Sequence, residues 1–294
     1  MKARSSFPTL LFLLPSVMLV VTFSYYPALS ALYHSLFAWD GYSPPVFTGI
    51  ANFRTLLEDP IIIISVKNML VLILSAVGIT LTLPLLAAEL VYHVRNERMQ
   101  YLYRVLFIIP MVVPMVVTLL VWQFAYDPNI GILNTLLKSI GLGNLARTWL
   151  ADPRIALYAI IGVGFPWVSG LNFLLYLAAL QNISPDIRDS CALDGVGPLK
   201  KVLRIDLPII KGQVRVLVVL AVIGVLQAFI QIWVLTQGGP AGATMVPSVA
   251  LYQNGFMYGN FGYASAIGAA LFFVTLILTF INMRVIRSDD GAES

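Results

Sequence analysis

The sequence predicts an all-α membrane protein with six transmembrane helices. Of the 294 residues, 59% are hydrophobic and only 11% are Asp, Glu, Lys or Arg, and the mean hydropathy is +0.87. A typical soluble domain carries about 25% charged residues. This chain therefore has too few charged residues to form the water-exposed surface of a soluble enzyme. At about 20 apolar residues per span, its length accommodates six helices and short loops without a further soluble domain.

Six apolar runs define the expected helices. They cover residues 7–33, 69–92, 105–126, 155–180, 216–236 and 262–283. A continuous run satisfies its backbone in lipid only as a helix, whereas a transmembrane barrel shows shorter, alternating segments. Pro110 and Pro114 predict a kink in the third run, and the fourth is expected to be one span with Pro166 inside it. The first run is too long for the core of a signal peptide, although Ala28-Leu29-Ser30 weakly resembles a cleavage site.

The basic residues predict the orientation of these helices. With six spans, both termini and the 93–104 and 181–215 loops lie on one side of the membrane. That side carries thirteen Lys and Arg residues, and the other side carries five. The excess predicts that both termini are cytoplasmic. The net charge of +4 therefore follows the topology and does not indicate nucleic-acid binding.

The motifs that are missing argue against an enzyme. The sequence contains no P-loop, no G-x-S-x-G elbow and no H-E-x-x-H motif. Cys191 is the single cysteine and the two histidines, His34 and His93, lie far apart, so we expect no disulfide and no metal site. We also expect no catalytic residue, since the carboxylates are scattered along the chain.

Ionisable residues are also missing from the middle of the runs. Glu89 and Lys67 lie near the ends of spans. Proton-driven carriers usually place such groups within the bilayer. A secondary, ion-coupled transporter that binds sodium through backbone carbonyls stays open as an alternative, as does a membrane scaffold with no transport function.

The long loop between the fourth and fifth runs predicts a folded helix–turn–helix elbow outside the bilayer. Ser184 is suited to cap a helix that begins at Pro185, and Gly195 to end it in a left-handed conformation. Pro198 can begin a second helix and Pro208 is expected to end it. Composition alone leaves two interpretations of the elbow open: it binds anionic membrane lipid, or it docks a cytoplasmic protein.

The elbow carries a family resemblance. Asp189-Ser190-Cys191, Asp194-Gly195 and Ile205-Asp206-Leu207-Pro208 resemble the E-A-A-x-x-D-G signature and the I-x-L-P that follows it. This signature, the EAA loop, is typical of binding-protein-dependent ABC importer permeases with the MetI-like type I fold. Asp189 replaces the leading Glu, and Ser190 and Cys191 replace two Ala, which preserves the carboxylate and the small volumes.

Other stretches resemble the carbohydrate-uptake branch of this family, which includes maltose, glycerol-phosphate and multiple-sugar permeases. They are Asn68, Tyr103-Arg104, Pro110, Trp122, Leu235–Pro240, Thr244 and Gly262–Ala266. The resemblance implies a permease subunit in a bacterial plasma (inner) membrane that imports a sugar or related polyol. It divides the chain into a first helix and outer loop (1–63), a MetI-like domain with helices 2–6 (64–284) and a cytoplasmic tail (285–294).

The resemblance also implies the partners. They are a second permease, two ATP-binding cassette subunits that hold ATP and Mg²⁺, and an extracytoplasmic solute-binding protein, whereas this chain holds no cofactor. The 184–208 loop is then the coupling helix that docks on the ATPase. Its coupling residues are Asp189, Ser190, Cys191, Asp194, Gly195, Leu207 and Pro208.

The fourth and fifth runs carry candidate substrate contacts. They are Trp167, Ser169, Asn172, Phe173, Tyr176, Gln227, Gln231 and Trp233. Ser169, either Asn172 or Phe173, and Tyr176 can share one helix face. Amides and hydroxyls hydrogen-bond sugar hydroxyls and aromatic rings stack on sugars, so these residues predict a neutral, polyhydroxylated solute. The alternative is that they join helices within lipid.

Overall fold

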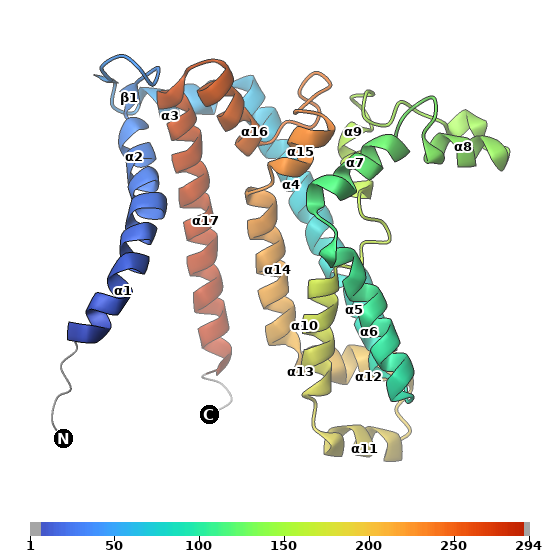
Figure 1. Ribbon diagram of the computed structural model, residues 1–294. Coiled ribbons are helices and arrows are strands. Elements are labelled where there is room, and N and C mark those ends of the chain that lie inside the picture. Colours follow the sequence, from blue (N-terminus) through green and yellow to red (C-terminus); the bar gives the residue numbers. More distant parts are fainter. Residues whose placement is uncertain (1–6, 291–294) are drawn as a thin grey trace. The chain divides into compact units, whose positions relative to one another are not determined.

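The computed structural model describes residues 7–290, and the side chains of residues 12–281 other than 192 and 198. The bases Lys2 and Arg4 and the side chains of Arg284 and Arg287 lie outside these described parts. The described chain is mostly helical (Figure 1) and forms two compact units. One unit comprises the chain up to Ile63 together with Ala250–Val274, and the other comprises Ile64–Val249 and the chain from Thr275 onward.

The first unit joins the N-terminal helix to a small outer-loop structure. The helical elements that begin it are α1 (Phe7–Val20), the π-helical turn η1 (Val21–Tyr25) and α2 (Tyr26–His34). A two-stranded antiparallel ribbon follows, with β1 (Phe37–Ala38) paired to β2 (Val46–Phe47), and then α3 (Ala51–Glu58). The remaining elements are α16 (Pro247–Tyr252), η4 (Gln253–Met257) and the first part of α17 (Phe261–Asp290).

Close backbone contact explains the glycine that opens α17. The Gly262 N–H donates to the Trp39 carbonyl at 3.0 Å. A Cβ atom on Gly262 would lie 2.0 Å from the Phe37 carbonyl oxygen, so only glycine fits. The small side chains that follow, including Ala264 and Ala266, are buried. They therefore have a packing role, as expected for small residues in membrane helices.

The second unit contains the remaining helices. They are α4 (Pro60–Leu81), α5 (Leu83–Tyr92), α6 (Glu97–Val112), α7 (Met115–Ala125), α8 (Ile132–Ser139), η2 (Gly143–Leu145), α9 (Ala156–Gly162), α10 (Gly170–Gln181), α11 (Pro185–Leu193), α12 (Pro198–Lys201), η3 (Val202–Asp206), α13 (Leu207–Ile209), α14 (Lys211–Leu226) and α15 (Ile230–Leu235). Their core forms where α5 packs on α10, around the fully buried Ala88, Phe173, Tyr176 and Leu180.

Several predicted spans are interrupted. Within the described residues, three helical stretches are long and apolar enough to cross a membrane, at Phe12–His34, Pro60–Tyr92 and Phe261–Ile281. The expected kink in the third run is confirmed, because α6 and α7 meet at an angle of 87°. The prediction of a continuous fourth span is wrong: α9 and α10 are separated by residues 163–169. A six-span count stays a prediction.

Local conformation explains the break in the fourth run. Gly164 and Trp167 both have positive φ angles, of 82° and 56°, which a helix cannot contain. Pro166 also lacks the backbone donor that a helix needs at that position. The fifth run is likewise broken between α14 and α15. The helix of the second run begins at Pro60, before the expected start at residue 69.

The predicted topology can be tested with single cysteines. Tyr42 is 94% exposed in the loop after α2, and Leu193 is 88% exposed in the elbow. In a Cys191→Ser background, an impermeant maleimide added to intact cells should label Tyr42→Cys and not Leu193→Cys, because bases place the elbow inside. Cys191 itself is buried and therefore unsuitable as a probe. Outside labelling of Leu193→Cys would contradict the topology.

Candidate coupling elbow and substrate cavity

The first half of the elbow forms as its sequence predicts. The Ser184 hydroxyl accepts the backbone N–H of Asp186 at 3.3 Å and α11 begins at Pro185. Gly195 has φ +63°, and the Val196 N–H donates to the Cys191 carbonyl at 3.1 Å. This six-to-one bond across a left-handed glycine is a Schellman motif. The helix α11 therefore has defined caps at both ends.

The second half of the elbow corrects one expectation. Pro208 does not end the helical path, since it lies at the start of α13, where its missing N–H costs no helical bond. The path instead bends by 76° between α13 and α14. Asp206, which lies within the family motif, is fully buried and ion-paired to Lys201 at 2.9 Å.

The outward surface of the elbow combines apolar and charged side chains. Leu193 is 88% exposed and Leu199 is 72% exposed, beside the exposed Asp189 and Asp194. Of the other predicted coupling residues, Ser190, Gly195 and Pro208 are exposed, Cys191 is buried and Leu207 packs on the core. Such a surface is suited to docking against another protein.

The broken fourth run is held by side chains that bind its free carbonyls. The last four carbonyls of a helix lack helical partners, and in α9 they belong to residues 159–162. Ala159 accepts the Tyr126 hydroxyl at 2.7 Å, Ile160 accepts the Gln231 amide at 3.0 Å, and Ile161 accepts the Trp167 indole N–H at 2.8 Å. The Gly162 carbonyl accepts the Phe165 N–H at 3.2 Å. All four carbonyls are thus bonded.

The same arrangement recurs at two other breaks. Pro84 in α5 cannot donate to the carbonyl four residues earlier, that of Thr80, and this carbonyl accepts the Tyr176 hydroxyl at 3.1 Å. After α14, the Ala228 carbonyl accepts the Ser248 hydroxyl. Polar side chains in the apolar runs therefore complete the backbone hydrogen bonding of broken helices.

The Leu235–Pro240 motif and the residues after it form an ordered turn. The Thr244 hydroxyl, fully buried, donates to the Gly239 carbonyl at 2.7 Å and lies 2.7 Å from the Thr236 hydroxyl. The Asn68 amide donates to the carbonyls of Gly242 and Met245. The sequence alone marked Asn68 as part of a resemblance, and the structure shows that it anchors this turn to α4.

A cavity of about 170 Å³ lies beside the broken helices. It is lined by Leu72, Ser75, Ala76, Ile79, Ile160, Ile161, Val163, Trp167, Val225, Ala228, Gln231 and Ile232. Trp167 and Gln231 are the predicted contacts that it brings together. Ser75 is a further polar lining residue that the sequence did not single out, because one serine in an apolar helix carries no distinguishing pattern.

The other predicted contacts lie elsewhere in this structure. Phe173 and Tyr176 are fully buried in the core, so they do not share an accessible face with Ser169. Ser169 caps α10 by accepting the Asn172 N–H, and Asn172 is half-buried. Gln227 is exposed at the end of α14, and Trp233 stacks on Phe229 with ring centres 5.6 Å apart.

Tyr126 was not singled out by sequence, and its bond to the Ala159 carbonyl makes a stability prediction. Tyr126→Phe should lower the free energy of unfolding by about 1 kcal/mol, because the buried carbonyl loses a donor. The measurement is the thermal unfolding midpoint in detergent. The control is Tyr158→Phe on α9, where the ring is 65% exposed; it should change stability by less than about 0.5 kcal/mol. Equal effects would contradict the proposed bond.

Comparison with known proteins agrees with this architecture. Residues 80–288 match the family described as binding-protein-dependent transport system inner membrane component. A probable ABC transporter permease of Pyrococcus horikoshii is 34% identical over 272 residues, which cover 92% of each chain. The diacetylchitobiose uptake system permease of Streptomyces coelicolor is 30% identical, over 93% of this chain and 80% of its own length.

A solved structure shares the fold. It is a bacterial alginate ABC transporter in complex with an alginate pentasaccharide-bound periplasmic protein, and its matching chain is 23% identical. The alignment covers 94% of this chain and 93% of that chain, with a TM-score of 0.81. The described helices therefore form a MetI-like permease fold. This chain belongs to the inner-membrane components of binding-protein-dependent transport systems and is a permease subunit of an ABC importer.

Proposed function

We propose that this permease forms part of the translocation pathway for a neutral sugar or related polyol, and that the 184–208 elbow couples it to a separate ATPase. The observation that carries the proposal is the elbow, whose family motif folds into a capped helix with exposed apolar side chains. An exposed leucine is costly to leave in water. Docking of the elbow on a protein partner would remove Leu193 of α11 and Leu199 of α12 from water.

The uncharged cavity supports a neutral solute. Its polar lining residues are Ser75, Trp167 and Gln231, and none of the described residues that line it is ionisable. An anionic solute would lose hydration there without gaining a positive partner, which costs several kcal/mol. The relatives differ in this respect, since diacetylchitobiose is a neutral sugar and alginate is an acidic polysaccharide. The choice of a neutral solute therefore rests on the uncharged lining of the cavity.

The complete transporter in this proposal contains a second permease, two ATP-binding cassette subunits and an extracytoplasmic solute-binding protein. The alginate transporter was solved with a periplasmic protein, which supports the last of these partners. ATP and Mg²⁺ would bind to the ATPase subunits, and this chain would hold no cofactor. Both termini would lie in the cytoplasm of a bacterial cell, as the excess of bases in the 93–104 and 181–215 loops favours.

Substitution of Gly195 tests the coupling role. Gly195→Glu places a charge on the docking surface and strains a left-handed backbone by about 1 kcal/mol. We expect solute uptake to fall roughly tenfold or more, a loss of about 1.4 kcal/mol in coupling, while the permease still inserts. The measurements are uptake and the amount of ATPase that co-purifies.

Gly195→Asn is the matched control. Asparagine tolerates the left-handed conformation better than other side chains, and a Cβ atom at this position meets no atom within 4 Å. Uptake should stay close to that of the wild type. Normal uptake and ATPase binding in Gly195→Glu would show that the elbow is not the docking element.

Competition between solutes tests the proposed substrate class. Proteoliposomes containing the assembled transporter should import neutral mono- or oligosaccharides, and acidic sugars should compete weakly. Gln231→Ala should slow uptake about three- to tenfold, the effect of one hydrogen bond, with assembly checked by co-purification. Asn172 and Gln227 both lie outside the cavity lining, so Asn172→Ala and Gln227→Ala are the controls and should leave uptake close to that of the wild type. Uptake of an acidic sugar that neutral sugars do not inhibit would contradict the proposal.

A further inference from the structure

A buried carboxylate lies without a hydrogen-bond partner at the C-terminal end of α5. The side chain of Glu89 is 6% exposed, and neither of its carboxylate oxygens has a hydrogen-bond partner in the described chain. Burial of an ionised carboxylate is unfavourable unless a positive group or a metal ion binds it. The ion pair that Glu89 makes in the described chain is with His93, whose Nδ1 lies 3.7 Å from Oε2, too far for a hydrogen bond.

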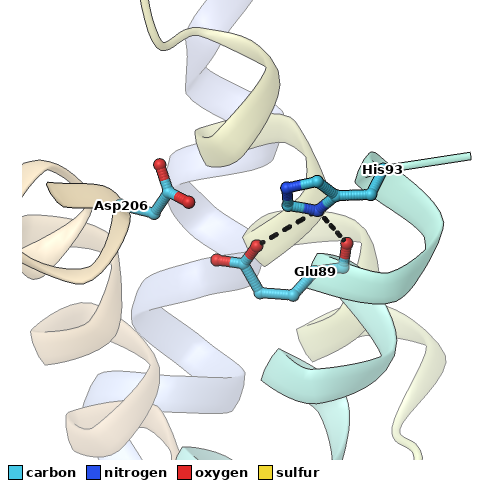
Figure 2. A group of neighbouring side chains, drawn as sticks. All are labelled: Glu89, His93 and Asp206. Atoms are coloured by element: carbon cyan, nitrogen blue, oxygen red, sulfur yellow. Dashed lines mark hydrogen bonds and ion pairs between the residues drawn. The ribbon is translucent and has the colours of Figure 1, made fainter. Parts of the chain in front are cut away.

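Two further side chains of types that can bind metal ions lie close to Glu89. His93 lies one turn later on α5, and Asp206, fully buried, comes from η3 in the elbow. One potential ligand atom from each of the three residues lies within 4.8 Å of the others. Figure 2 shows the three side chains converging from α5 and η3.

The imidazole is oriented as a metal ligand usually is. His93 Nδ1 lies 2.8 Å from the Glu89 backbone carbonyl and 3.7 Å from its Oε2, so the carbonyl accepts the Nδ1 proton. The lone pair is then on Nε2, which Figure 2 shows on the side of the ring that faces Asp206. A backbone bond that fixes the tautomer in this way is typical of histidines that bind metals.

The net charge of these side chains, with both carboxylates ionised, favours the binding of a cation. Lys201 Nζ lies 2.9 and 3.2 Å from the two oxygens of Asp206. Each carboxylate oxygen has two lone pairs, so Asp206 can bind Lys201 and a metal ion together. Two carboxylates beside one ammonium group carry an excess negative charge, which a divalent cation would neutralise.

Although the sequence led us to expect no metal site, we propose that Glu89, His93 and Asp206 form a binding site for a divalent transition-metal ion such as Zn²⁺. One imidazole nitrogen with two carboxylate oxygens suits Zn²⁺ or Mn²⁺ better than Mg²⁺ or Ca²⁺, which prefer oxygen alone. Zn²⁺ binds these atoms at about 2.0–2.2 Å, so the side chains must close slightly around it. The ion would link α5 to η3 and hold the exit of the elbow against the membrane helices.

Zinc titration of the full chain tests this site. The protein is purified with a tag that lacks histidine, in a Cys191→Ser background, treated with a chelator and titrated with Zn²⁺ in buffer containing Mg²⁺. The variants are His93→Gln and Glu89→Gln. The matched control is His34→Gln, because His34 Nδ1 makes the same bond, at 2.8 Å, to the carbonyl of Ser30 four residues earlier.

We expect saturable binding of one Zn²⁺ per chain, weakened roughly tenfold or more by His93→Gln or Glu89→Gln and unchanged by His34→Gln. Absence of saturable binding would overturn the proposal, as would equal affinity in His93→Gln. If the variants do not fold, Co²⁺ bound to the unsubstituted site provides a second measurement. A visible spectrum of nitrogen and oxygen ligation is expected, and the spectrum of hydrated Co²⁺ would overturn the proposal.

Discussion

A peptide carbonyl released by a break in a membrane helix must find a donor within the protein, and the larger unit of this permease is arranged around that constraint. Lipid supplies no hydrogen bonds, so each unpaired carbonyl is costly. Three consecutive carbonyls at the end of α9 bind donors from three places, namely Tyr126, Gln231 and Trp167. These bonds connect the break to the end of α7 and to α15, and thereby position the walls of the cavity.

This constraint changes the interpretation of the polar residues in the apolar runs. Tyr176 is oriented inward by the Thr80 carbonyl that Pro84 leaves without a donor, so its hydroxyl is a structural group. In the proposal, Gln231 and Trp167 have a structural function and a solute-binding function. Each binds a carbonyl with one N–H and lines the cavity with the rest of its side chain. Breaks in helices thus create a polar surface in the cavity wall without any ionisable residue among the described residues that line it.

The elbow is attached to the membrane helices by charged and aromatic contacts. The buried Lys201–Asp206 pair holds η3, and both Lys201 and Arg188 lie over the ring of Tyr92 on α5, at 5.4 and 5.9 Å from its centre. Loss of one partner of a buried ion pair is strongly destabilising. A movement imposed on α11 by a docked partner would therefore be passed to α5 and to the α5–α10 core, which is how an ATPase could act on the pathway.

Composition and hydrophobic runs were sufficient to predict a helical membrane protein, because the lack of charge excludes a soluble surface. The caps of α11 were also predictable, since Ser184, Pro185 and Gly195 act through local backbone chemistry. The breaks at residues 163–169 and 227–229 were not predictable from hydropathy, because apolar side chains line both a helix and an interruption of one. The positions of Asp206 and Tyr176 required the tertiary structure. Asp206 is buried by packing although its partner Lys201 is local in the sequence, and Tyr176 is positioned by a carbonyl 96 residues away in the sequence. The sequence by itself thus determined that this is a helical membrane protein with a folded elbow, whereas tertiary packing decided which polar groups bind backbone and which line the cavity, because hydrogen-bond partners distant in the chain leave no periodic pattern.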